Sequence, residues 1–216
     1  MIAPGFALVF DLDGVIVDSM PMHAEAWRVY LKRHGASVTD LDARMHGRRN
    51  DEIVEEFLGR ALSPAAIFEH GSAKERLFRE MMQPQLDRHI VTGVLAFLER
   101  ANGTPMAVAS NAERANIDFV LDGAGIRGRF QHVVDGNQVE RAKPAPDIYL
   151  RAAALLGISP GHCVVFEDSP TGIEAATRAG TRVVGVGTHT LDLPPVDLLI
   201  RDFNDPALLP WLAEVR

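Results

Sequence analysis

The chain has 216 residues, 47% of them hydrophobic, and a formal net charge of −7. This hydrophobic content is enough to form the buried core of one domain, or of a core domain with a small insertion, and it argues against disorder. The acidic balance argues against a general nucleic-acid binder, which would carry clustered basic surface, although it leaves room for a local basic patch. No apolar run approaches the ~20 residues of a membrane span, and no signal-type segment is present, so we expect a cytoplasmic protein without membrane or nucleic-acid partners.

An apolar run from Phe6 to Phe10 leads directly into two aspartates. The run is nearly free of polar residues and predicts a buried central strand. Asp11 and Asp13 follow it, and Gly14 gives the backbone freedom for a tight turn beside a ligand. Two carboxylates so close together repel each other unless a cation or a shared proton offsets the repulsion. A divalent metal is the simplest offset.

The segment over residues 20–88 is predicted to be helical throughout, because it shows apolar faces at helical spacing and no convincing strand. Trp27 and Leu31 stand one helical turn apart. Ser63 and Pro64 predict a helix start, since serine caps helix N-termini and proline fits the first turn, and Pro84 predicts the end. We therefore expect a helical insertion between the two parts of an α/β core, residues 1–19 and 89–216.

From Ile90 onward helices and strands alternate, which indicates a parallel sheet with crossover helices. Strands are expected at 106–109, 133–134, 163–166, 182–186 and 198–200, and helices at 94–100, 115–121, 146–156, 171–179 and within 203–216. The predicted fold is α/β, a doubly wound, Rossmann-like parallel sheet. Because such sheets bind ligands beyond the carboxyl ends of their strands, the polar residues at these ends should converge. They are Asp11, Asp13, Ser110, Glu167 and Asp168.

These stretches resemble the motifs of the haloacid dehalogenase-like hydrolase superfamily, most of whose members are Mg-dependent phosphatases. Asp11 to Val15 is similar to the first motif. The later motifs follow in order as Val108-Ala109-Ser110-Asn111, Lys143-Pro144 and Phe166-Glu167-Asp168-Ser169 with Gly172. The resemblance runs nearly end to end, and Asp11 to Trp27, including His23, is similar to the β-phosphoglucomutase and sugar-phosphate phosphatase branch. That branch carries a mobile helical cap where the insertion lies.

The resemblance implies that Asp11 is the nucleophile and forms an aspartyl-phosphate. It implies that Asp13 protonates the leaving oxygen and later deprotonates the attacking water or hydroxyl. The cofactor would be Mg²⁺, a hard ion that prefers oxygen ligands. Its ligands would be Asp11, the main-chain carbonyl of Asp13, Asp168 and, completing or adjusting the shell, Glu167. Ser110 and the N–H groups near Asn111 would bind phosphoryl oxygens, and Lys143 would add a fixed positive charge.

Each of these motifs also has a structural interpretation. Ser110-Asn111 alone is typical of a helix cap, as is Glu167-Asp168-Ser169, and Lys143 alone is typical of a surface lysine. Their joint order along the chain favours the active-site interpretation.

In the insertion, His23 is either a packed or capping histidine or a residue that gates the substrate. Lys74 aligns with a cap lysine of the resembled branch that approaches the substrate or the nucleophile, but the sequence slightly favours a solvated helix lysine.

The cluster His46-Gly47-Arg48-Arg49-Asn50 suits a loop that contacts the non-reacting end of an anionic substrate. β-Phosphoglucomutases show Lys-Gly-x-Ser-Arg there, so His46 replaces the lysine and Asn50 the arginine. This replacement puts the second-phosphate clamp of a mutase in doubt, and Arg48 and Arg49 are the candidates to supply it instead.

The sequence therefore predicts a Mg-dependent phosphatase that acts on a small phosphorylated metabolite, with a sugar or polyol phosphate as the expected class. The alternative is a β-phosphoglucomutase-type mutase, which would return the phosphoryl group to a sugar hydroxyl. A third hypothesis is a non-catalytic regulatory protein that keeps the fold, against which the complete motif set argues. Nothing in the sequence requires more than a monomer.

Overall fold

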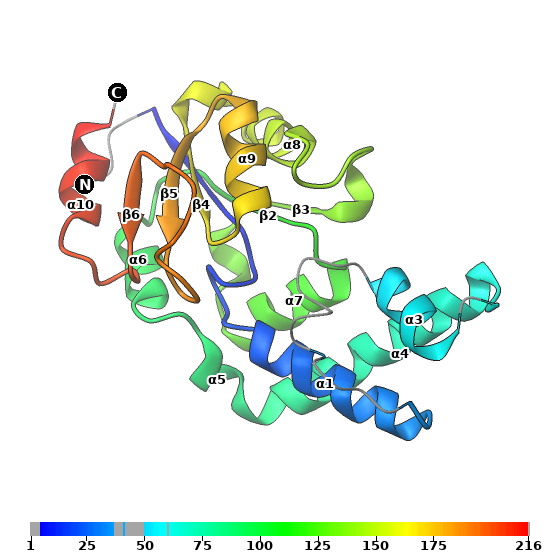
Figure 1. Cartoon of the computed structure of the whole chain (residues 1–216). Coiled ribbons are helices and arrows are strands. Elements are labelled where there is room, and N and C mark those ends of the chain that lie inside the picture. The colour runs from blue at the N-terminus through cyan, green and yellow to red at the C-terminus, as the bar shows by residue number, and fades with distance from the viewer. Residues whose placement is uncertain (1–4, 37–40, 42–49, 60, 216) are drawn as a thin grey trace. The chain divides into compact units, whose positions relative to one another are not determined.

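The structure is a computed structural model that describes residues 5–36, 41, 50–59 and 61–215. It divides into two compact units, Met1–Asp18 with Asp87–Arg216, and Ser19–Leu86. We call the first the core unit and the second the helical unit; Figure 1 labels most of their helices and strands. No described helix is long and apolar enough to cross a membrane.

The core unit is built on a six-stranded sheet with the order β3-β2-β1-β4-β5-β6. Its strands are β1 (Ala7–Phe10), β2 (Met106–Ser110), β3 (His132–Asp135), β4 (Cys163–Glu167), β5 (Arg182–Val186) and β6 (Leu198–Ile200). Every neighbouring pair is parallel, so the predicted doubly wound parallel sheet is confirmed. Because β1 pairs with both β2 and β4, Asp11 lies where the strand order changes direction, the place where such sheets bind ligands.

The helices of the core unit follow the predicted alternation. They are α6 (Val94–Arg100), α7 (Arg114–Gly123), α8 (Asp147–Leu156), α9 (Pro170–Ala179) and α10 (Leu208–Glu214), with short 3₁₀ turns at Arg127–Arg129, Gly136–Gln138 and Pro160–His162. Both α8 and α9 end at a glycine in the left-handed region, Gly157 (φ 68°) and Gly180 (φ 77°). Glycine adopts this conformation without the strain a Cβ would bring, so the sequence stops these helices where predicted.

The two faces of β1 pack against different helices, because successive side chains of a strand point to opposite faces. Ala7 and Val9 lie in a buried cluster with residues of α8 and α9, which Figure 1 shows together beside the sheet. Phe10 points to the other face. Its ring stacks on that of Phe166, with centroids 4.7 Å apart, and meets Phe97 of α6 edge-on at 6.2 Å.

The helical unit consists of α1 (Met20–Arg33), α3 (Asn50–Leu58), α4 (Pro64–Met82) and the 3₁₀ turn Gln83–Gln85, and α5 (Leu86–His89) begins at its end. No described residue of this unit lies in a strand, which confirms a helical insertion after β1. Ser63 caps α4 as predicted, because its hydroxyl accepts a hydrogen bond from the Ala66 amide at 3.2 Å. The apolar face that includes Trp27 and Leu31 packs against α3 and α4 in one buried cluster.

Replacement of Phe10 by alanine is expected to lower the free energy of unfolding by about 3–5 kcal/mol, because it leaves a cavity among packed aromatic rings. Urea unfolding followed by circular dichroism measures the change. Phe68→Ala is the matched control, since Phe68 is 76% exposed and its loss should change stability by less than about 0.5 kcal/mol. Equal effects of the two variants would contradict this account of the core.

Candidate active site

The loop after β1 is folded tightly around the two aspartates. The Asp11 amide donates to the Phe166 carbonyl at 3.0 Å, and the Gly14 amide donates to the Val17 carbonyl at 2.7 Å. Gly14 has φ +74°, and a Cβ at this position would overlap the Asp168 carboxylate. The glycine is therefore required twice, for its backbone conformation and for the space that Asp168 occupies.

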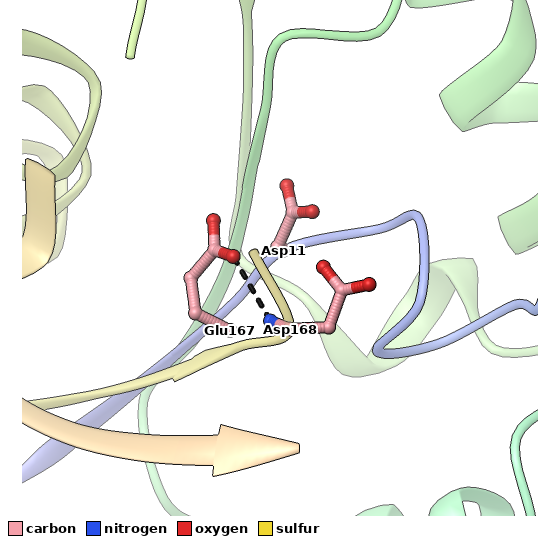
Figure 2. A group of neighbouring side chains, drawn as sticks. All are labelled: Asp11, Glu167 and Asp168. Carbon is pink, nitrogen blue, oxygen red and sulfur yellow. Dashed lines mark hydrogen bonds between the residues drawn. The ribbon is translucent and has the colours of Figure 1, made fainter. Parts of the chain in front are cut away.

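Three carboxylates gather at the ends of two neighbouring strands. Asp11 follows β1, Glu167 is the last residue of β4, and Asp168 comes next. One oxygen from each lies within 4.8 Å of the others, and Figure 2 shows the three side chains grouped at the strand ends. Asp11 and Glu167 are buried and Asp168 is largely so. The convergence expected from the parallel sheet is therefore present for these three residues.

Lys143 joins this cluster from the loop before α8. Its ammonium donates to Asp11 Oδ1 at 2.7 Å and to Glu167 Oε1 at 2.6 Å. The Lys143 side chain is only 5% exposed, so it is not the surface lysine of the structural interpretation. A fixed positive charge thus lies beside the proposed nucleophile.

Glu167 accepts five hydrogen bonds from residues that the structure describes. Besides Lys143, the Tyr149 hydroxyl donates to Oε1 at 2.7 Å. The amides of Asp168 and Ser169 donate to Oε2 at 2.9 and 3.1 Å, and the Ser169 hydroxyl at 3.0 Å. Ser169 also caps α9 through the Gly172 amide at 3.1 Å, so the capping interpretation is correct for this residue.

The acid–base properties of the three carboxylates differ because their partners differ. Burial raises the pKa of Asp11 to about 7; Lys143 lowers it, but Glu167 and Asp13 add repulsion. Burial, and repulsion from Glu167, Asp11 and Asp13, raise the pKa of Asp168 to about 9. Burial also opposes ionisation of Glu167, yet its hydrogen bonds and Lys143 outweigh burial and leave its pKa below the usual range. Glu167 is thus the permanent anion.

The pKa of Lys143 is raised although burial alone would lower it, because the charges of Asp11 and Glu167 prevail. Lys143 therefore stays cationic, and the cluster still carries more negative than positive charge once its carboxylates ionise. Carboxylate oxygens at this spacing are the donors that Mg²⁺ prefers. The acidic cluster can hold a divalent cation, and of its members Asp11 and Asp168 carry the carboxylates that a cation would most stabilise in the ionised form.

Ser110 and Asn111 lie at the end of β2, next to β1. The buried Ser110 hydroxyl accepts a hydrogen bond from the Ala112 amide at 3.1 Å, which leaves its proton to be donated. Asn111 Oδ1 accepts the Lys143 amide at 3.4 Å and so links this loop to the lysine. The N-cap residue of the following helix α7 is Glu113, whose side chain makes no capping hydrogen bond. Ser110 and Asn111 are therefore not helix caps.

In the helical unit the predicted residues His23, Asn50 and Lys74 meet in one polar cluster, in which Lys74 is buried and His23 and Asn50 are half-buried. The Lys74 ammonium lies 3.1 Å from His23 Nδ1 and 2.5 Å from Glu75 Oε1, and Asn50 Nδ2 donates to the same oxygen at 2.6 Å. Lys74 is 1% exposed, so the expectation of a solvated helix lysine is wrong. Burial, and then Lys74, lower the pKa of His23 to about 3 although Glu75 raises it. His23 is therefore neutral at physiological pH.

The other four residues of the predicted substrate loop, His46, Gly47, Arg48 and Arg49, lie outside the described residues.

Sequence reasoning missed several residues, among them Tyr149, which contacts Glu167 in the core unit, and Glu75, which contacts Lys74 and Asn50 in the helical unit. Tyr149 and Glu75 carry no local signal, because their hydrogen bonds depend on how helices pack. Thr188 and His189 could have been found, because they follow β5 at the same edge of the sheet. The Thr188 hydroxyl donates to the Gly14 carbonyl at 2.6 Å, and His189 Nε2 lies 4.0 Å from Asp168 Oδ2.

The chain is similar to haloacid dehalogenase-like hydrolases both in sequence and in structure. The family described as haloacid dehalogenase-like hydrolase matches residues 7–180. The chain is 34% identical to fructose-1-phosphate phosphatase YqaB of Escherichia coli, with 83% of this chain and 95% of the relative covered. It is 30% identical to the beta-phosphoglucomutase of Bacillus subtilis, with 94% and 92% covered. A crystal structure of a family IA hydrolase from Entamoeba histolytica is similar, with a TM-score of 0.87 at 26% identity and coverage of 97% and 98%.

Mg²⁺ is expected to bind more tightly as pH rises from about 6 to about 9, because the metal-free protein holds protons on Asp11 (pKa about 7) and Asp168 (pKa about 9) that the cation must displace. Affinity should rise up to about tenfold per pH unit for each proton released. Calorimetric titration in buffers of different ionisation enthalpy counts these protons. In Asp168→Asn the affinity should fall and its pH dependence should flatten. An affinity independent of pH would contradict the assignment.

Proposed function

The chain belongs to the haloacid dehalogenase-like hydrolases, in the branch of sugar-phosphate phosphatases and beta-phosphoglucomutases, and from this premise we propose that it is a Mg²⁺-dependent phosphatase of a small phosphorylated metabolite. One observation carries the proposal. A buried carboxylate that follows the central strand, Asp11, is paired with a buried ammonium, Lys143, beside two further carboxylates. A nucleophile, a fixed cation and a cation-binding cluster are the requirements of phosphoryl transfer from an anionic ester.

In the proposed first step, a carboxylate oxygen of Asp11 attacks the phosphorus of the ester. The bond between phosphorus and the ester oxygen breaks, and Asp13 gives its proton to that leaving oxygen, so that the product departs as an alcohol. In the second step, Asp13 takes a proton from water, whose oxygen attacks the phosphorus of the aspartyl-phosphate. Phosphate leaves, and both aspartates return to their starting states.

The other core residues would bind the phosphoryl group rather than react with it. Lys143 would contact the phosphoryl oxygens from its place beside Asp11, and the Ser110 hydroxyl would donate to another of them. Mg²⁺, held by Asp11, Asp168 and the main-chain carbonyl of Asp13, would neutralise the charge of the phosphoryl group when bound. Glu167 would hold Lys143 in place through its carboxylate.

Hydrolysis and mutase chemistry share this first step, and relatives of both kinds are similar to the chain. Asn50 favours hydrolysis. It occupies the place of the arginine in the mutase pattern, and its amide donates to Glu75 Oε1 inside the helical unit. An amide without charge, held by a buried carboxylate, is a poor clamp for the second phosphate of a bisphosphate intermediate. The mutase remains the alternative function.

The proposed substrate class is a sugar or polyol phosphate. The support is the named activity of the relative from Escherichia coli, a fructose-1-phosphate phosphatase that the chain matches over 95% of that relative's length.

Asp11→Asn is expected to fold normally and to lose turnover by about 10³-fold or more, because an amide is not a nucleophile toward phosphorus. Phosphate release from a panel of sugar phosphates in the presence of Mg²⁺ measures the loss, and circular dichroism checks the fold. Substantial residual turnover would remove Asp11 from this role. Absence of Mg²⁺-dependent turnover in the folded wild-type protein would instead support the non-catalytic hypothesis.

³¹P NMR should distinguish hydrolysis from mutase chemistry, because it follows free phosphate and isomerised sugar phosphate together. The protein is incubated with Mg²⁺ and sugar phosphates, including β-glucose 1-phosphate with a bisphosphate primer, and Asp11→Asn is the control. We expect free phosphate with little isomer. Isomer without phosphate release would establish the mutase and would point to Arg48 or Arg49 as the second-phosphate clamp.

A further inference from the structure

We infer that Tyr149 is a positioning residue for phosphoryl transfer, which fixes the ammonium of Lys143 through the carboxylate of Glu167. The inference rests on the proposed function and extends it to a side chain outside the family motifs quoted above.

Tyr149 reaches Lys143 in two ways. It lies in the first turn of α8, six positions after the lysine, and is fully buried. Its hydroxyl donates to Glu167 Oε1 at 2.7 Å, the same oxygen that accepts the Lys143 ammonium at 2.6 Å. Its ring also lies beneath the ammonium, with the centroid 4.9 Å from Nζ. The lysine is thus held by a shared acceptor and by an aromatic face.

The carboxylate of Glu167 can link Tyr149 to Lys143 because its hydrogen bonds prevent it from rotating. A carboxylate offers about four lone-pair sites, and the donors described above fill them. Three of these donors belong to Asp168 and Ser169 and tie Oε2 to the start of α9. Oε1 is therefore a fixed point, shared between the hydroxyl of Tyr149 and the ammonium of Lys143.

Because Tyr149 and Lys143 share Oε1, removal of the Tyr149 hydroxyl should move the Lys143 ammonium in a definite direction. Without the hydroxyl, Oε1 has an unpaired site in a dry environment, and Lys143 is its remaining donor. The ammonium should then move toward Glu167 and away from Asp11 Oδ1, where the phosphoryl group reacts. The phenyl ring of a Tyr149→Phe variant still fills the space, so the change isolates the hydrogen bond.

The kinetic test compares Tyr149→Phe with Tyr30→Phe on the substrate that the wild-type protein hydrolyses best. Tyr30 is the matched control, because its hydroxyl makes an equally short bond, 2.8 Å to His70 Nδ1, within the helical unit. We expect kcat of Tyr149→Phe to fall about 10- to 100-fold, the effect of one hydrogen bond to a charged group, while KM and the Mg²⁺ affinity stay within about twofold. Tyr30→Phe should retain the wild-type kcat.

A second readout does not depend on turnover. The chain has three lysines, Lys32, Lys74 and Lys143, so ¹⁵N-lysine labelling gives few ammonium signals, and Lys→Arg variants assign them. The Lys143 signal should shift in Tyr149→Phe and stay unchanged in Tyr30→Phe. If Tyr149→Phe does not fold, Glu167→Gln removes the charged acceptor that links Tyr149 to Lys143, and it should shift the Lys143 signal and lower kcat relative to the wild-type protein.

The outcomes separate this inference from the proposed function. A wild-type protein without phosphatase activity would refute the function, while the Lys143 signal would still decide whether Tyr149 positions the lysine. An unshifted Lys143 signal in Tyr149→Phe, or a raised KM with unchanged kcat, would overturn the inference.

Discussion

The core unit depends on one buried group of charges, the ammonium of Lys143 between Asp11 and Glu167. Removing charges from water is expensive, and a buried pair is stable only when further hydrogen bonds complete it. Glu167 has those bonds and Asp11 has fewer, so the two carboxylates beside one lysine behave differently. When Asp11, Glu167 and Asp168 are all ionised, one ammonium leaves the group with two net negative charges, which one divalent cation would neutralise.

Much of this arrangement could be predicted, because a parallel sheet brings the carboxyl ends of its strands together whatever their distance in sequence. Asp11, Ser110 and Glu167 come from strands that proved to be neighbours. Lys143 could be assigned to the site only from the order of the motifs along the chain. Nothing in the sequence around it shows that it contacts Asp11, 132 positions away. The hydrogen bond of Tyr149 could not be predicted, because a tyrosine on an apolar helix face has the same pattern whether or not its hydroxyl has a partner.

The helical unit shows where periodicity misleads. Lys74 and Glu75 lie within α4, where charged residues are usually assigned to solvent. Both are buried, because His23 of α1 and Asn50 of α3 meet them there. Such pairing joins helices that are distant in sequence, so local spacing cannot reveal it. The same cluster changes the meaning of a substitution: Asn50 lacks the charge of the mutase arginine and also serves as a partner for Glu75.

Gly172 has a consequence for how the site keeps its charge. A Cβ at this position would overlap the Glu167 carboxylate, so the first turn of α9 lies directly against that group. The amino-terminal end of a helix carries a partial positive charge from its aligned peptide dipoles. Peptide dipoles neither titrate nor dissociate. The backbone thus adds to Lys143 and Tyr149 in keeping Glu167 ionised, and its contribution stays the same whether or not a cation is bound beside the carboxylate.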